Sequence, residues 1–258
     1  MGFYDLSKEE RQRLVETIDH AIWEGFKEKN PALVLPYFSD EDTYIRKTAY
    51  LAVGKIQKKG LLDIDAIVPF LNQLLLSDSE KVRQTIVNAA GELGKSHFQE
   101  VVHFFDQSLF DAHHSVRNAV IGSIKKMGEK NPKPILAWAE GYLKHPDKEI
   151  RREICHGIEL RGRTHPEDVL PLLRKLQHDD TARVRNTLVH VLGQIAYKKG
   201  CLPTVVTDLN SWENKTLVQK ALDEIVDVHH RYKNFATLSQ AEAITYIDKH
   251  YIETKKAI

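Results

Sequence analysis

The stretch TARVRNTLVHVLGQI, residues 181–195, is one copy of a motif that is repeated along the chain. Its pair of a β-branched residue followed by arginine recurs at the same place in four earlier segments. These segments are DTYIRKTAYLAVGKI (42–56), SEKVRQTIVNAAGEL (79–93), HHSVRNAVIGSIKKM (113–127) and DKEIRREICHGIELR (147–161). Successive arginines fall 37, 34, 34 and 34 residues apart, and a sixth copy, NKTLVQKALDEIVDV (214–228), carries Gln219 instead. Self-similarity at such a period predicts a repeat protein.

Each copy has the apolar spacing of an amphipathic helix. Counted from the arginine, apolar residues recur at positions −1, +3, +7 and +10, which in the copy at 181–195 are Val184, Leu188, Leu192 and Ile195. A second apolar segment precedes each copy, as in PEDVLPLLRKL (166–176), and its proline suits a helix start. The sequence therefore predicts one helical hairpin in each repeat.

Helix pairs at a period near 34, with Asp before and Arg after the start of the second helix, resemble HEAT repeats over residues 37–230. We therefore expect an all-α fold, a right-handed α-solenoid of about six HEAT-like helical-hairpin repeats that form an armadillo-type superhelix. A single domain is expected over residues 1–258, with N-terminal cap helices at 1–36 and a C-terminal cap helix at 231–258. SKEE (7–10) and SQAE (239–242) are capping boxes suited to begin helices in the two caps.

Composition narrows the classes of protein to consider. The net charge is +1, and the only cysteines, Cys155 and Cys201, cannot form a disulfide framework. Because no apolar run has the length of a membrane span, we expect no membrane contact. We also expect a cytoplasmic monomer without a cofactor. Charge is uneven, however: residues 1–42 hold 5 basic and 10 acidic side chains, whereas residues 143–200 hold 12 and 8. A polyanionic partner would therefore meet the second half.

The phased arginines invite two interpretations, a nucleic-acid contact or a structural anchor. Each lies beside the apolar stripe of its helix, and in four copies an aspartate, Asp40, Asp78, Asp111 or Asp179, lies five or six positions earlier. An arginine so placed can bond a turn or a carboxylate and stack one repeat on the next. We interpret five residues as structural anchors: Arg46, Arg83, Arg117, Arg151 and Arg185.

Positions +1, +5, +8 and +12 of each copy point away from the apolar stripe, and in a solenoid they would line the concave face. Amides, arginine and histidine are frequent there, and these groups suit phosphates and base edges as well as the backbone of a peptide. The candidate residues for binding nucleic acid or another partner are Lys47, Gln84, Asn88, Asn118, Lys125, Arg152, His156, Arg163, Asn186 and His190.

The fourth copy concentrates charge on this face. Arg152, His156, Glu159 and Arg163 are spaced 4, 3 and 4 apart and would be neighbours on one helix. Such a group could do acid–base work or bind an anion, or it could be a surface ion-pair cluster. We expect no metal, because His156 and His190 lack the further ligands that a metal site needs. Cys155 lies beside the apolar stripe, which favours packing over reactivity.

The fourth and fifth copies more narrowly resemble the HEAT-like DNA alkylation repair glycosylases. The matching elements are His145, Pro146, Ile150, Arg151, Arg152, Gly157, Asp179, Val184, Arg185 and Trp212. The resemblance implies excision of positively charged alkylated bases, which requires a carboxylate and aromatic side chains. Where one branch of that family carries an acid, this chain has His156, so the possible catalytic residues are Glu159, His156 and Glu129.

Three functions follow from these patterns. The chain could be a HEAT-repeat binding protein whose concave face holds a macromolecular partner, with DNA among the candidates. It could be a DNA glycosylase of the alkylation repair type, or a scaffold for a protein partner. A glycosylase needs its acid and aromatic side chains in one groove, whereas binding needs only the polar stripe.

Overall fold

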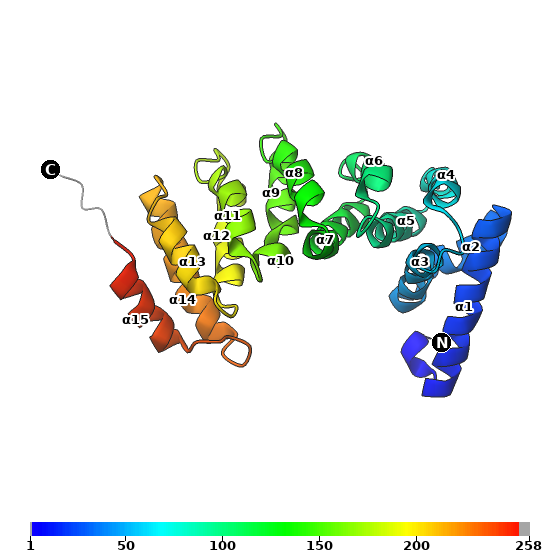
Figure 1. Cartoon of the computed structure of the whole chain (residues 1–258), viewed down its shortest axis with the longest axis horizontal. Coiled ribbons are helices and arrows are strands. Elements are labelled where there is room, and N and C mark those ends of the chain that lie inside the picture. The colour runs from blue at the N-terminus through cyan, green and yellow to red at the C-terminus, as the bar shows by residue number, and fades with distance from the viewer. Residues whose placement is uncertain (1, 253–258) are drawn as a thin grey trace. The chain divides into compact units, whose positions relative to one another are not determined.

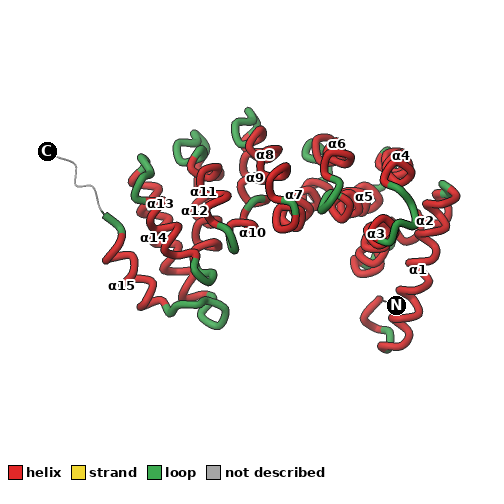
Figure 2. The backbone as a smooth tube through the Cα atoms, viewed as in Figure 1, coloured by secondary structure: helices red, strands yellow, loops and turns green. Residues whose placement is uncertain are grey.

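The computed structural model describes residues 2–252, where the regular structure is helical and no strand occurs (Figures 1 and 2). The chain divides into two compact units, Met1–Asn131 (unit 1) and Pro132–Ile258 (unit 2). Within the two units, six helical hairpins follow one another in the chain, which gives the all-α solenoid fold that the repeat predicts.

Unit 1 has three hairpins after an N-terminal helix, and the second helices of these hairpins, α3, α5 and α7, pack on one another in chain order. Helix α1 packs against α2 and α3, so it covers the end of this row. The bounds are η1 Phe3–Asp5, α1 Lys8–Glu28, α2 Pro31–Phe38, α3 Thr43–Lys58, α4 Ile64–Leu75, α5 Glu80–Leu93, α6 Phe98–Ser108 and α7 His114–Lys130.

Unit 2 repeats this plan. Helix α12 packs between α9 and α14, while the first helices α11 and α13 pack together, and α15 packs on α14 and α13. The bounds are α8 Pro132–Tyr142, α9 Lys148–Gly157, α10 Glu159–Gly162, α11 Pro166–Arg174, α12 Ala182–Ala196, α13 Cys201–Leu209, α14 Lys215–Arg231 and α15 Gln240–His250.

The apolar stripe of each second helix forms the core between the two layers of helices. In α12 the four predicted stripe residues, Val184, Leu188, Leu192 and Ile195, are completely buried. Burying a side chain of this size contributes roughly 1.5–3 kcal/mol, so that repetition of the stripe stabilises the stack of hairpins.

The fourth copy departs from the predicted single helix. Helix α9 ends at Gly157, and after Ile158 the chain continues as the short α10. A Cβ atom on Gly162 would lie 2.5 Å from Ile195 Cδ1, so glycine lets α10 press directly against α12. The break turns Glu159 inward, where it is 1% exposed, although the helical spacing had placed it on the outward face.

Both predicted capping boxes are formed. Ser7 and Glu10 cap α1, and Ser239 and Glu242 cap α15, each through reciprocal side-chain and backbone hydrogen bonds. The expected C-terminal cap extends to residue 258, and residues 253–258 lie outside the described residues. Among the described helices, none combines the length and the apolar character that crossing a membrane requires.

Candidate functional site

The anchor arginines join turns to helices and repeats to repeats. Arg151 donates two hydrogen bonds to the carboxylate of Asp179, from Nε at 2.6 Å and from Nη2 at 3.0 Å. Its Nη1 donates to the backbone carbonyls of His145 and Pro146, at 2.8 and 2.9 Å. The guanidinium of Arg151 is therefore occupied within the fold.

The other anchors follow the same plan. Arg83 binds the carboxylate of Asp111, with Nε 2.7 Å from Oδ2. Arg46, Arg117 and Arg185 donate to backbone carbonyls in the turn before their own helix. The carboxylates of Asp111 and Asp179 bind the arginine of the preceding repeat, so these two pairs join one repeat to the next.

The Arg151–Asp179 pair is electrostatically strong. Burial alone would raise the pKa of the Asp179 carboxyl, but hydrogen bonds from Arg151 and from the Thr181 backbone N–H outweigh burial and hold this pKa below its usual value. The same carboxylate raises the pKa of the Arg151 guanidinium. Both groups are charged near neutral pH, so that the pair links the two repeats as an ion pair.

We use the name second-helix surface for the outward side of α3, α5 and α7 in unit 1, and of α9, α12 and α14 in unit 2. In unit 1 a hollow of about 320 Å³ between α3 and α5 is lined by Lys47, Gln84 and Asn88, together with Tyr44 and Tyr50. Lys47 is exposed and Asn88 half-buried. Two further candidates lie on α7, the exposed Asn118 and the half-buried Lys125.

The amide of Gln84 has partners inside unit 1. Its Oε1 accepts from Arg46 at 3.4 Å, and its Nε2 donates to the Ser115 carbonyl at 3.4 Å. Asn88 donates to the Gln84 carbonyl at 2.9 Å. Gln84 thus bridges three successive second helices, whereas Lys47 projects from the surface.

In unit 2 the candidates gather between α9 and α12. Arg152, His156, Asn186 and His190 line a hollow of about 510 Å³, together with Arg183 and Thr187. Arg163 does not line it, because this side chain binds Glu159 and lies 2.9 Å from Gln194 Oε1. The structure therefore brings four of the predicted binding residues to one hollow.

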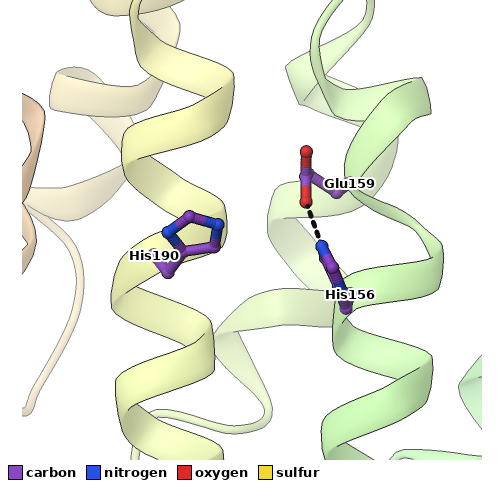
Figure 3. A group of neighbouring side chains, drawn as sticks. All are labelled: His156, Glu159 and His190. Atoms are coloured by element: carbon purple, nitrogen blue, oxygen red, sulfur yellow. Dashed lines mark ion pairs between the residues drawn. The ribbon is translucent and has the colours of Figure 1, made fainter. Parts of the chain in front are cut away.

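Two histidines and a buried carboxylate converge beside this hollow (Figure 3). His156 Nε2 lies 2.9 Å from Glu159 Oε2, and one ligand atom from each of His156, Glu159 and His190 lies within 4.8 Å of the others. His190 Nδ1 faces Glu224 of α14 at 3.6 Å. The expectation of no metal rested on the two histidines alone and did not count Glu159 as a third possible ligand.

Carboxylates neutralise the arginines on the second-helix surface of unit 2. Arg152 Nε lies 2.9 Å from Glu149, and Arg183 Nη1 lies 3.2 Å from the same carboxylate. Arg231 Nη2 lies 2.6 Å from Glu224. The excess of basic residues over 143–200 therefore does not produce a surface of unpaired arginines here.

Lysines gather instead in unit 1, which the sequence reasoning missed. A hollow of about 630 Å³ is lined by Lys55, Lys58, Lys95 and Lys130, with Glu92 as its acidic residue. Lys55 and Lys95 form ion pairs, with Asp19 and Glu92 respectively, whereas Lys58 and Lys130 are exposed. The signal was present in the sequence as lysine at position +12 of the first two copies.

The side chains that a glycosylase would need are poorly placed. Glu159 is 1% exposed and binds Arg163, and Trp212 is also 1% exposed, with its Nε1 donating to Asp208 at 2.6 Å. Glu129 is exposed on α7. A buried tryptophan with a satisfied N–H packs in the core and does not present a face for a base to stack on.

Cys155 is completely buried in α9, and burial raises the pKa of its thiol. A thiol in such surroundings stays protonated and is a poor nucleophile near neutral pH. Its place in the core is that of a small apolar side chain.

Comparison with known proteins gives the same type of fold. The sequence profile described as HEAT repeats matches residues 135–210. No curated protein matches the sequence of the chain.

Among solved structures, AlkD2 from Streptococcus mutans superposes with a TM-score of 0.56 at 19% sequence identity, covering 76% of this chain and 97% of that one. The MAST/Orbit N-terminal domain gives a TM-score of 0.51 at 16% identity, covering 76% of this chain and 96% of that one. At these identities the likeness establishes a shared fold.

Proposed function

Because the chain is built of HEAT-like repeats, we propose that it is a binding scaffold that holds an extended segment of a protein partner on its second-helix surface. One observation carries the proposal: hollows lie between successive second helices and are lined by amide, hydroxyl, apolar and basic side chains, and the arginines among these are bonded within the fold. Such a lining suits the alternating donors and acceptors of a peptide backbone.

Asn186 of α12 lies between two hollows of unit 2. It is exposed and lines both the hollow shared with α9 and a second hollow of about 290 Å³ toward α14. Its amide makes no hydrogen bond to another residue within 2–252, so its donor and acceptor are available to a backbone that crosses α12. Val189 and Leu217 line the second hollow and can receive an apolar side chain.

The hollow in unit 1 is lined by a different set of side chains. The hollow between α3 and α5 combines the phenol ring of Tyr44, which is 45% exposed, with the ammonium group of Lys47. Tyrosine gives a large, rigid contact area at low entropic cost and is enriched at protein interfaces. Lys47 and the exposed Lys58 and Lys130 favour a partner segment with carboxylates on this side.

Duplex DNA fits the part of this surface in unit 2 less well. Binding to DNA draws its affinity from cations that neutralise phosphates, but Arg152, Arg183 and Arg231 of unit 2 are paired with carboxylates. Each phosphate contact there would compete with an existing ion pair. The buried Glu159 and Trp212 likewise give the glycosylase alternative no support.

The proposal is tested by selecting from a displayed library of random 16-residue peptides on the immobilised full chain, in buffer containing a metal chelator. The selected peptide, labelled with fluorescein, is then titrated by fluorescence anisotropy against wild-type protein, Asn186→Ala and Lys47→Ala. We expect Asn186→Ala to weaken a peptide held by unit 2, and Lys47→Ala a peptide held by unit 1, by about 5- to 30-fold, which corresponds to the 1–2 kcal/mol of a useful interface contact.

Thr207→Ala is the matched control, because Thr207 lines a hollow on the first-helix layer between α11 and α13. This variant should bind the peptide as the wild type does. Failure to select any peptide, or equal loss of affinity in the control, would count against the proposal. Tight binding of a 30-base-pair duplex in its place would favour the DNA alternative.

A further inference from the structure

Beyond a partner-binding role and independent of it, we propose that His156, Glu159 and His190 form a binding site for a divalent transition metal ion, with Zn²⁺ as the preferred ion. The three side chains come from α9, α10 and α12 of unit 2 and point toward one another (Figure 3). The two histidines are 34 residues apart, one full repeat, so they occupy equivalent positions on α9 and α12.

The geometry is close to what zinc requires. Zinc binds imidazole nitrogen and carboxylate oxygen at about 2.0–2.2 Å, so ligand atoms in a tetrahedral shell lie roughly 3.3 Å apart. His156 Nε2 and Glu159 Oε2 are 2.9 Å apart, which is already near this spacing. The largest separation in the group is within 4.8 Å, so His190 has to move by roughly 1.5 Å to complete the shell.

His190 has the freedom to make that movement. Its side chain is 45% exposed on α12, and its contact with Glu224 is long at 3.6 Å. Nδ1 faces Glu224, so Nε2 lies on the other side of the ring, directed toward His156 and Glu159 (Figure 3). A metal-bound histidine characteristically has its second ring nitrogen beside a carboxylate, which orients the ring. Glu224, itself held by Arg231 at 2.6 Å, supplies that group.

Glu159 is held in place as a ligand should be. Its side chain is 2% exposed, and while Oε2 faces His156, Oε1 accepts a hydrogen bond from Arg163. Arg163 also donates to Gln194 Oε1 at 2.9 Å, so the group that orients the carboxylate is itself fixed to α12. A buried carboxylate with one oxygen bonded to arginine and the other directed at imidazole can bind a cation without losing its supporting contact.

The donor set selects the class of ion. Two imidazoles and one carboxylate suit Zn²⁺ and its neighbours in the first transition row, whereas Ca²⁺ and Mg²⁺ prefer all-oxygen sites. The hollow lined by His156 and His190 opens beside the cluster, which leaves room for water or an external ligand to complete the coordination. Three protein ligands and one open position are the usual pattern of an accessible zinc site.

The experiment uses full-length protein freed of metal with a chelator and titrated with ZnCl₂ by isothermal titration calorimetry. We expect one strong equivalent of Zn²⁺, and at least about a tenfold weaker affinity in His156→Ala and in His190→Ala, because even supporting residues of metal sites cost 10–100-fold. MgCl₂ should give no comparable binding.

His178→Ala is the matched control, since this exposed histidine of unit 2 pairs with Glu213 at 3.2 Å and lies outside the cluster. The control should bind as the wild type does. Circular dichroism of each metal-free variant verifies that it is folded. Absence of a strong equivalent, or equal affinity in wild type and both histidine variants, overturns the proposal.

Discussion

Replacing Arg151 with alanine should destabilise unit 2 by about 3 kcal/mol. The Arg151 and Asp179 side chains are 11% and 4% exposed, and removing one partner of such a pair typically costs 3–5 kcal/mol because the other charge stays buried. We take the lower end, since Asp179 keeps a hydrogen bond of 2.9 Å from the Thr181 N–H. Two backbone carbonyls, of His145 and Pro146, also lose their donor.

The assay is urea denaturation of full-length protein at pH 7 and 25 °C, followed by circular dichroism. Arg183→Ala is the control, because Arg183 is 65% exposed and its ion pair with Glu149, at 3.2 Å, lies at the surface. Exposed pairs of this kind contribute about 0–1 kcal/mol, so the control should unfold nearly as the wild type does. If Arg151→Ala cost no more than the control, the structural interpretation of the anchor arginines would be refuted.

The dependence of this difference on pH gives a second check. The folded-state pKa of Asp179 lies below its usual value of 3.8, so the pair contributes stability above that pH and loses it as the pH falls toward the folded-state pKa. The stability gap between wild type and Arg151→Ala should therefore be full at pH 7 and shrink below about pH 4. A gap that is constant down to pH 3 would contradict the ion-pair account.

Two further predictions concern packing. Gly162→Ala should lower the free energy of unfolding by about 1–3 kcal/mol, because the added methyl group overpacks against Ile195 and Val169. Gly122→Ala is the comparison: it adds a methyl group in open space within α7 and should raise the free energy of unfolding by up to about 1 kcal/mol. Thermal unfolding measures both variants, and equal shifts in melting temperature would contradict the contact between α10 and α12. The thiols of Cys155 and Cys201 are buried, and burial raises their pKa values. An aromatic disulfide reagent should therefore modify them slowly in native protein and rapidly in urea. Fast labelling of the native protein would contradict the burial of these two thiols.

Periodicity in the sequence was sufficient to predict the hairpins. Val184, Leu188, Leu192 and Ile195 are buried as their spacing indicates, because helical geometry converts that spacing directly into one face. The capping boxes were equally predictable, since the motif at Ser7 and its hydrogen bonds involve only neighbouring residues.

Features that depend on contacts between repeats were not predictable in the same way. A helical wheel assumes an unbroken helix, so it could not show that the break after Gly157 turns Glu159 inward. The net charge of residues 143–200 says nothing about which charges are paired. It therefore could not show that Glu149 binds both Arg152 and Arg183. His156 and His190 come together because α9 packs on α12. Their equivalent positions in successive repeats suggested that they are neighbours, but not how far apart their ring nitrogens lie.

The most direct test of the proposed binding role is a pair of titrations on the same protein, one with the selected fluorescein-labelled peptide and one with a labelled 30-base-pair duplex, at 50 and 200 mM NaCl. The peptide should bind more tightly than the duplex at both salt concentrations, and Asn186→Ala should weaken the peptide alone. Tighter binding of the duplex, with a loss of about 10³-fold or more between the two salt concentrations, would show that phosphates are the true ligand and contradict the account.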